Sequence, residues 1–181
     1  GKAQDDDPLL ISFTSFVNSV DDNELTPLMY AALNNSVQAA HYLLHSSRFY
    51  KLVINVNSRD VSGRTALHYA AKIGADQIAL ELLQLEGVNK DPLDNALRLP
   101  SHFAAHFGHS SALLVLITNG SSIEKRSKNG WTPIKFAIAR GSLKCVSLLL
   151  KHLQLDKNER NDLYHFADNI EQYDIAKLIL K

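Results

Sequence analysis

Apolar residues in this chain recur in pairs of short segments separated by polar, turn-rich stretches. The first segment of a pair is compact and rich in alanine, as in Thr-Ala-Leu-His-Tyr-Ala-Ala at residues 65–71. The second places apolar residues at helical spacing, as at Ile78, Leu82 and Leu83, which is typical of one buried helix face. A glycine such as Gly74 separates the two and is a common helix-ending residue. The pattern therefore predicts repeated pairs of short helices.

The pairs are copies of one another. Four segments align without gaps, at residues 25–32, 64–71, 98–105 and 131–138. Measured from Thr26, Thr65, Leu99 and Thr132, the steps between copies are 39, 34 and 33 residues. A fifth, weaker copy begins near Asp162. Self-similarity at a period of about 33 residues is the signature of a stacked repeat architecture.

Each copy carries the same local signals. A threonine can cap the amino end of the first helix through its hydroxyl, and the proline that follows in two copies suits the first helical position. Polar stretches such as residues 56–63 and 123–130 end in glycine and are typical of extended hairpins between the helix pairs.

These residues resemble ankyrin repeats. The segment Asp60–Gly74 follows the family pattern D-x-x-G-x-T-P-L-H-x-A-A-x-x-G almost throughout, and Gly108-His109 and Asn129–Pro133 match it as well. The resemblance covers residues 16–181. It implies an all-α solenoid of helix-turn-helix units with short β-hairpin fingers, and a function in protein–protein recognition.

We expect one ankyrin-repeat domain over residues 9–181, preceded by a disordered or vector-derived tail at residues 1–8. Residues 9–20 resemble the end of an incomplete repeat. The five repeats are expected near residues 21–59, 60–93, 94–126, 127–156 and 157–181. The polar helices of the last repeat suit a terminal capping unit.

Several positions depart from the family pattern. Leu99 replaces the capping threonine, at an expected cost of about 1 kcal/mol. Ser101 replaces a leucine and is expected to leave the local core underfilled. The first step is about six residues longer than the norm of about 33, and we place the excess in a lengthened loop at His45–Ile54.

Composition and charge narrow the function. The chain has 181 residues, 19 basic and 19 acidic side chains and one cysteine. A neutral total argues against nucleic-acid binding, and a single cysteine favours a reducing compartment. No apolar run is long enough to span or insert into a membrane. We therefore expect an intracellular, cytoplasmic protein, with the nucleus as an alternative, that is monomeric in isolation.

The charge is unevenly distributed along the chain. Residues 1–30 carry one lysine against six acidic residues, whereas residues 124–160 carry nine basic and three acidic residues. The second stretch is a candidate surface for an acidic partner, although an ordinary solvated face would have the same composition.

The histidines are the strongest candidates for chemistry, and the repeat accounts for most of them. His102, His106 and His109 have spacings that suit a zinc site on a helix, but two of them occupy positions that the family uses structurally. His68, His102 and His165 share one position, at which the family's imidazole bonds to the next repeat. Cys145 is expected in the core. We predict no catalytic, cofactor-binding or metal-binding residue.

The resemblance also implies a groove formed by the short helices and the fingers. By matching positions, the expected partner-binding residues are Asn23, Leu25, Arg64, Lys72, Ile73, Asn95, Arg98, His106, Phe107, Lys128, Asn129, Trp131 and Arg140. Trp131, Phe107 and Ile73 are large apolar side chains at positions expected to be exposed, which is typical of interfaces. The alternative is that Trp131 packs along the neighbouring hairpin.

The sequence therefore predicts a protein–protein interaction module that binds an acidic or amphipathic partner segment in this groove. An alternative is a targeting or regulatory region of a larger enzyme or channel. A further possibility is enzymatic hydroxylation of Asn57, which lies in a Val-Asn hairpin of the type that the family modifies.

Overall fold

The computed structural model describes residues 15–50 and 54–181, and these contain five successive helix pairs. The expected tail at residues 1–8, and residues 9–14 of the expected partial repeat, lie outside the described residues. The pairs are α2 (Pro27–Leu33) with α3 (Val37–Tyr50), α4 (Ala66–Ile73) with α5 (Asp76–Leu83), α6 (Pro100–Phe107) with α7 (Ser110–Thr118), α8 (Pro133–Arg140) with α9 (Leu143–His152), and α10 (Lys157–Asn169) with α11 (Tyr173–Ile179).

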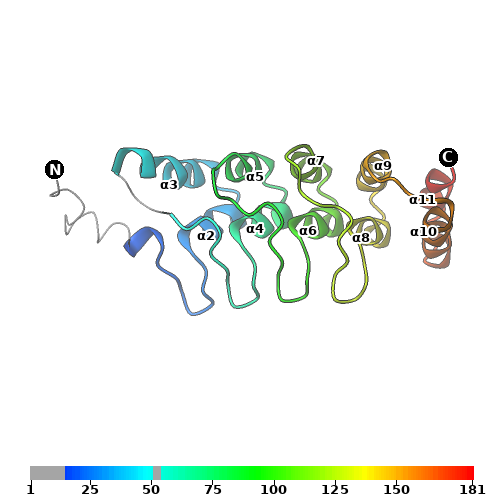
Figure 1. The fold of residues 1–181 in the computed structure, drawn as a ribbon, viewed down its shortest axis with the longest axis horizontal. Coiled ribbons are helices and arrows are strands. Elements are labelled where there is room, and N and C mark those ends of the chain that lie inside the picture. The colour runs from blue at the N-terminus through cyan, green and yellow to red at the C-terminus, as the bar shows by residue number, and fades with distance from the viewer. Residues whose placement is uncertain (1–14, 51–53) are drawn as a thin grey trace.

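The pairs stack side by side into an elongated body (Figure 1). The first helices of successive pairs, α2, α4, α6 and α8, form an inner row, and α3, α5, α7 and α9 form an outer row above it. The long connections between pairs project as fingers on the side of the inner row. Each unit therefore contacts mainly its neighbours, as expected for a solenoid.

Small side chains allow the two rows to approach closely. Ala70, Ala71, Ala104 and Ala105 in the inner helices are all fully buried. Leucine and isoleucine side chains of the outer helices, such as Leu116, close the same core. One continuous hydrophobic cluster runs from α2 to α11, so the predicted all-α solenoid is confirmed.

The fingers are tight turns, and no β-strand forms in residues 15–50 or 54–181. In the second finger the carboxylate of Asp60 accepts hydrogen bonds from the backbone N–H groups of Ser62 and Arg64, at 2.9 and 2.7 Å. Single backbone bonds join neighbouring fingers, as from Val61 N–H to the Asn23 carbonyl at 3.2 Å. One bond per junction is too few for a β-ladder, so the fingers lie side by side without forming a sheet.

The extra residues of the first repeat lengthen a helix. Helix α3 has 14 residues and continues to Tyr50, whereas its counterpart α5 has 8. The expectation of a lengthened loop at His45–Ile54 is therefore wrong over residues 45–50, and residues 51–53 lie outside the described part of the chain. Residues 37–50 contain no glycine or proline, so nothing in this segment stops the helix.

The two unusual residues of the third repeat are both accommodated. Leu99 is fully buried, and its backbone N–H donates to Nδ1 of His102 at 3.0 Å. Ser101 is also fully buried, and its hydroxyl donates to the Ser122 carbonyl at 2.8 Å. Packing of the leucine therefore takes the place of a capping hydroxyl, and the serine ties the helix to the next connection.

Threonine capping differs between repeats, which gives a test. The Thr26 hydroxyl accepts a hydrogen bond from the Met29 N–H, whereas Thr132 makes no side-chain cap bond. We expect Thr26→Ala to lower the free energy of unfolding by about 1 kcal/mol. Thr132→Ala should cost clearly less, as measured by urea denaturation. Equal losses for the two variants would contradict the assignment of the cap.

None of the helices in the described part of the chain combines the length and the hydrophobicity needed to cross a bilayer.

Candidate functional site

Two buried histidines join the inner helices. His68 and His102 each accept a hydrogen bond at Nδ1 from the backbone N–H three residues earlier, at 3.1 and 3.0 Å. Their Nε2 atoms lie 3.0 Å from the Arg98 carbonyl and 3.1 Å from the Trp131 carbonyl in the next repeat. Because Nδ1 must accept, Nε2 carries the proton and donates to the carbonyl. Each ring is therefore neutral and links one repeat to the next.

Burial explains why these rings stay neutral. Desolvation lowers the pKa of His68 and that of His102 to about 4, although the carbonyl contacts oppose the shift. The expected structural role is confirmed for these two residues.

The same position differs in the other repeats. It holds a buried Met29 in the first and Lys135 in the fourth, whose ammonium lies 5.6 Å from the centre of the Phe166 ring. His165 is exposed, so the expectation that it bonds to a neighbouring repeat is wrong. Among the described residues no further inner helix follows α10, so no next repeat offers the His165 ring a backbone carbonyl.

Asp60 and Asp94 occupy matching positions in the second and third fingers. What each carboxylate binds decides whether the arginine four residues later forms an ion pair. In the second repeat the Tyr69 hydroxyl donates to Oδ2 of Asp60. Phe103 occupies the corresponding place in the third repeat and has no hydroxyl. There Arg98 pairs with Oδ2 of Asp94 through Nε and Nη2, at 2.9 and 2.7 Å.

Arg64 is the counterpart of Arg98 but lacks its carboxylate. The Nε of Arg64 is buried without a hydrogen-bond partner, and the residue forms no ion pair within the described part of the chain. Its guanidinium carbon lies 5.4 Å from the centre of the Phe103 ring, and that of Arg98 lies 4.7 Å from the same ring. Tyr69 therefore takes the place at Asp60 that Arg98 takes at Asp94. Arg64 is left beside the Tyr69 hydroxyl, without an ion pair among the described residues.

These groups line one cavity on the inner row, with a volume of about 200 Å³. It spans α4, α6 and α8, and none of the residues lining it is acidic. The lining residues are Arg64, Lys72, Arg98, His102, Phe103, His106, Phe107 and Phe136. Positive charge above aromatic walls is an arrangement that suits a carboxylate or phosphate group attached to an apolar stem.

Five of the predicted partner-binding residues meet in this cavity, namely Arg64, Lys72, Arg98, His106 and Phe107. Sequence reasoning did not name Phe103 and Phe136, which form the aromatic walls of the cavity. His106 contributes mainly an aromatic edge. Desolvation, reinforced by the charges of Arg140 and Arg98, lowers its pKa.

The remaining predicted residues lie elsewhere. Asn23, Asn95, Lys128 and Asn129 are exposed on the fingers, Arg140 is exposed at the end of α8, and Leu25 packs against the core. The Asn95 side chain also donates to the Val61 carbonyl at 3.0 Å, so it joins two fingers.

The expected apolar cluster of Trp131, Phe107 and Ile73 does not line one cavity. Ile73 and Phe107 are 36% and 37% exposed. Trp131 is half-buried and makes edge contacts with Phe136 and with Phe166 of the next repeat, at centroid distances of 5.2 and 5.4 Å. Trp131 therefore packs between two repeats, which is closer to the alternative interpretation of this residue.

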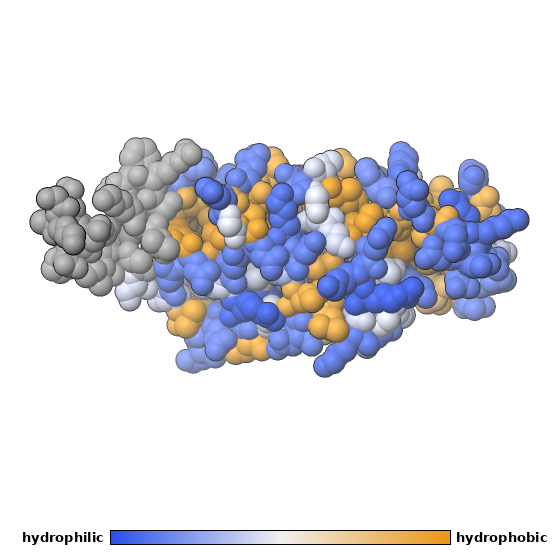
Figure 2. All heavy atoms as spheres, viewed as in Figure 1, coloured by the Kyte–Doolittle hydropathy of each residue, from blue (hydrophilic) through white to orange (hydrophobic). Residues whose placement is uncertain are grey.

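The surface as a whole is mixed. On the face shown in Figure 2, hydrophobic residues emerge in patches separated by hydrophilic ones. The basic residues of 124–160 also divide between surfaces: Lys128 and Arg140 lie on a finger and an inner helix, whereas Lys144 and Lys151 lie on the outer helix α9. A second cavity, of about 330 Å³, lies between α8 and α10 and is lined by side chains of both charges.

The histidine spacing considered for zinc does not gather three free ligands. His102 is bonded as described, and His109 Nε2 lies 3.1 Å from the Lys72 carbonyl. The histidines that do converge on a carboxylate are His41 and His45, with Glu81. Sequence reasoning did not consider this group, although histidines four residues apart on a helix were a visible signal.

Two further candidates are occupied by structural contacts. The Asn57 amide donates to the Gly87 carbonyl at 2.9 Å and accepts from the Asn89 N–H at 2.8 Å, so it spans two repeats. Cys145 is fully buried, and desolvation raises the pKa of its thiol. Burial and a raised pKa both disfavour the reactive thiolate.

Comparison with known protein families gives a clear match. A family model described as ankyrin repeats, in three copies, matches residues 7–94 and 101–181.

Among curated proteins, the chain is 39% identical to the tyrosine-protein kinase HTK16 of Hydra vulgaris over 98 residues, which is 53% of this chain and 13% of the kinase. It is 31% identical to alpha-latrotoxin-Lg1a of Latrodectus geometricus over 74% of this chain and 10% of the toxin. It is 28% identical to a transient receptor potential cation channel subfamily A member 1 homologue of Caenorhabditis elegans over 90% of this chain and 14% of the channel. The chain thus spans only 10–14% of the length of these relatives.

Proposed function

This chain belongs to the ankyrin-repeat family, and we propose that it recognises an acidic or amphipathic segment of a partner protein along its inner groove. Ankyrin repeats generally serve protein–protein interaction. The fold is a non-catalytic one, and we assign this chain no catalytic role, no cofactor and no nucleic-acid partner.

The observation that carries the proposal is the cavity lined by Arg64, Lys72 and Arg98 above Phe103. Arg98 is already neutralised by Asp94, so the charge available to a partner comes from Arg64 and Lys72. An aspartate or glutamate side chain could supply the hydrogen-bond acceptor that the buried Nε of Arg64 lacks. An adjacent apolar residue of the same segment could contact Phe107.

The groove can be tested with peptides selected from a random library on the immobilised chain. We expect the selected peptides to be enriched in acidic residues next to apolar ones. The double variant Arg64→Gln/Lys72→Gln should bind them at least 10-fold more weakly, because each lost charge-assisted contact contributes about 1.5–3 kcal/mol. Affinities would be measured by fluorescence anisotropy at two salt concentrations.

A matched control is Lys144→Gln/Lys151→Gln on the outer helix α9, which removes the same charge from exposed positions. It should leave the affinity within twofold. Selected peptides without acidic residues, or equal effects of the two double variants, would count against the groove.

The second candidate function is a targeting or regulatory region within a larger enzyme or channel. It is favoured by the relatives, since a kinase and a channel several times longer than this chain contain the matching segments. The complete reading frame around this segment would decide between the two, because a kinase domain or membrane-spanning helices in the same frame would support the second.

A further inference from the structure

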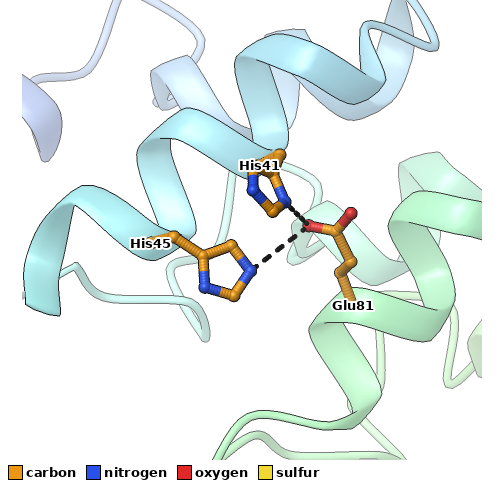
Figure 3. A group of neighbouring side chains, drawn as sticks. All are labelled: His41, His45 and Glu81. Carbon is orange, nitrogen blue, oxygen red and sulfur yellow. Dashed lines mark ion pairs between the residues drawn. The ribbon is translucent and has the colours of Figure 1, made fainter.

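His41, His45 and Glu81 form a separate cluster on the outer row, away from the groove. His41 and His45 lie four residues apart on α3, and Glu81 lies on the neighbouring helix α5. Figure 3 shows both imidazole rings directed at the same carboxylate. Because residues four apart share one face of a helix, the spacing places both rings opposite α5.

The distances suit a metal ion. His41 Nδ1 lies 3.4 Å and His45 Nε2 lies 3.8 Å from Oε2 of Glu81. All the potential ligand atoms lie within 4.8 Å of one another. Zinc bound tetrahedrally at about 2.0–2.1 Å from each ligand would hold such atoms about 3.3 Å apart. Small rotations of exposed side chains could close the remaining difference, since His41 is 61% exposed and His45 is 40% exposed.

The state of Glu81 is a second, independent observation. Its side chain is 23% exposed, and Oε2 is buried without a hydrogen-bond donor. A buried carboxylate oxygen without a partner is unfavourable, because it loses solvation without compensation. A cation bound between this oxygen and the two rings would compensate that loss.

We propose that His41, His45 and Glu81 form a zinc site with an open fourth position. Two imidazole nitrogens and one carboxylate are a common zinc ligand set in which the fourth position is left to water or an incoming group. The site would use Nδ1 of His41 and Nε2 of His45, so both atoms must be unprotonated for the metal to bind.

Such a site would fasten the first repeat to the second. Helix α3 is the lengthened helix of the first repeat, and its last turns, which contain His45, extend beyond the length of α5. A ligand that binds only the folded state raises stability by mass action. Zinc would therefore hold the amino-terminal end of the stack against α5.

The test is a titration of the metal-free chain with zinc chloride, in competition with a chromogenic chelator. We expect one equivalent to bind with a micromolar or lower dissociation constant and to raise the melting temperature by several degrees. Cobalt(II) should bind at the same stoichiometry and give the visible absorption of a tetrahedral complex, and magnesium should not bind.

Variants distinguish this site from adventitious binding. His41→Gln and Glu81→Gln should each weaken zinc binding at least 10-fold, and circular dichroism would verify that both variants fold without metal. His165→Gln, which removes an exposed histidine at the other end of the stack, should bind as the parent does. Absence of a stoichiometric zinc equivalent, or unchanged binding in Glu81→Gln, would overturn the proposal.

Discussion

Acidification from pH 7 to pH 4.5 is expected to lower the free energy of unfolding by about 5 kcal/mol through His68 and His102 alone. Both have a pKa near 4 in the folded protein, because they are buried and neutral. In the unfolded chain an ordinary histidine has a pKa near 6.5. Each ring therefore contributes a loss of roughly 2–3 kcal/mol at pH 4.5.

The sign and the pH window follow from these values. Below pH 6.5 these two histidines bind protons in the unfolded chain but stay neutral in the folded chain, so the free energy of unfolding falls as the pH drops toward 4. Burial acts to raise the pKa of Asp94, but the hydrogen bonds and charge of Arg98 together outweigh it and hold that pKa below its ordinary range, so this carboxylate weakens the fold only at still lower pH. The two effects are therefore separable in a series of urea denaturation curves with chelator present.

Variants identify the histidines as the cause. His102→Gln should be less stable at pH 7 but should lose only about half as much stability on acidification, since one of the two buried rings is gone. The exposed His165→Gln should retain the full pH dependence of the parent. A pH dependence that is unchanged in His102→Gln would show that other groups control acid unfolding.

Gly74→Ala is expected to cost about 3 kcal/mol of folding stability. Gly74 ends α4 with φ +79°, a left-handed conformation that costs an alanine about 1–2 kcal/mol. A Cβ atom there would also lie 2.7 Å from Nδ1 and 2.8 Å from Cγ of His109. The ring cannot move away freely, because its other nitrogen is bonded to the Lys72 carbonyl.

Gly87→Ala separates the two contributions. Gly87 has nearly the same φ, +78°, but no atom lies within 4 Å of the position of its Cβ. It should therefore lose only about 1 kcal/mol. The difference between the two variants, measured by chemical denaturation, is the cost of the contact with His109. Equal losses of stability in Gly74→Ala and Gly87→Ala would mean that the His109 ring moves aside at no measurable cost.

The sequence was sufficient to predict the repeat architecture, since helix stops, caps and apolar spacing recur with one period. It also predicted the role of His68 and His102, because both residues occupy a position that bridges repeats. The lengthened first repeat was placed in a loop because an insertion was assumed to fall between helices. The six extra residues of α3 relative to α5 instead continue the helix.

The candidate site was predictable only in part. The sequence identified Arg64 and Arg98 as groove residues, but it did not show that only Arg98 forms an ion pair. Whether the arginine pairs depends on whether a tyrosine hydroxyl is already bonded to the aspartate beside it. That contact follows from three-dimensional packing at Tyr69 and Phe103. The same holds for Glu81, whose approach to His41 depends on how α5 is placed against α3. Trp131 was expected to be exposed, but Phe166 of the next repeat contacts it and makes it half-buried. A contact between repeats of this kind does not follow from the pattern within one repeat.

In the fourth repeat Lys135 occupies the position that holds His68 and His102 in the second and third repeats, and this difference has a mechanical consequence. The second and third inner helices are each joined to the next repeat by a buried imidazole bonded to a carbonyl, whereas Lys135 offers Phe166 only a cation over an aromatic face. A cavity of about 330 Å³ lies at the same junction, between α8 and α10. A stack of units in series transmits tension through each junction in turn. The first junction also lacks this imidazole, but there the buried side chain of Met29 occupies the position. Under a stretching force along the stack, we therefore expect the junction before α10 to open first.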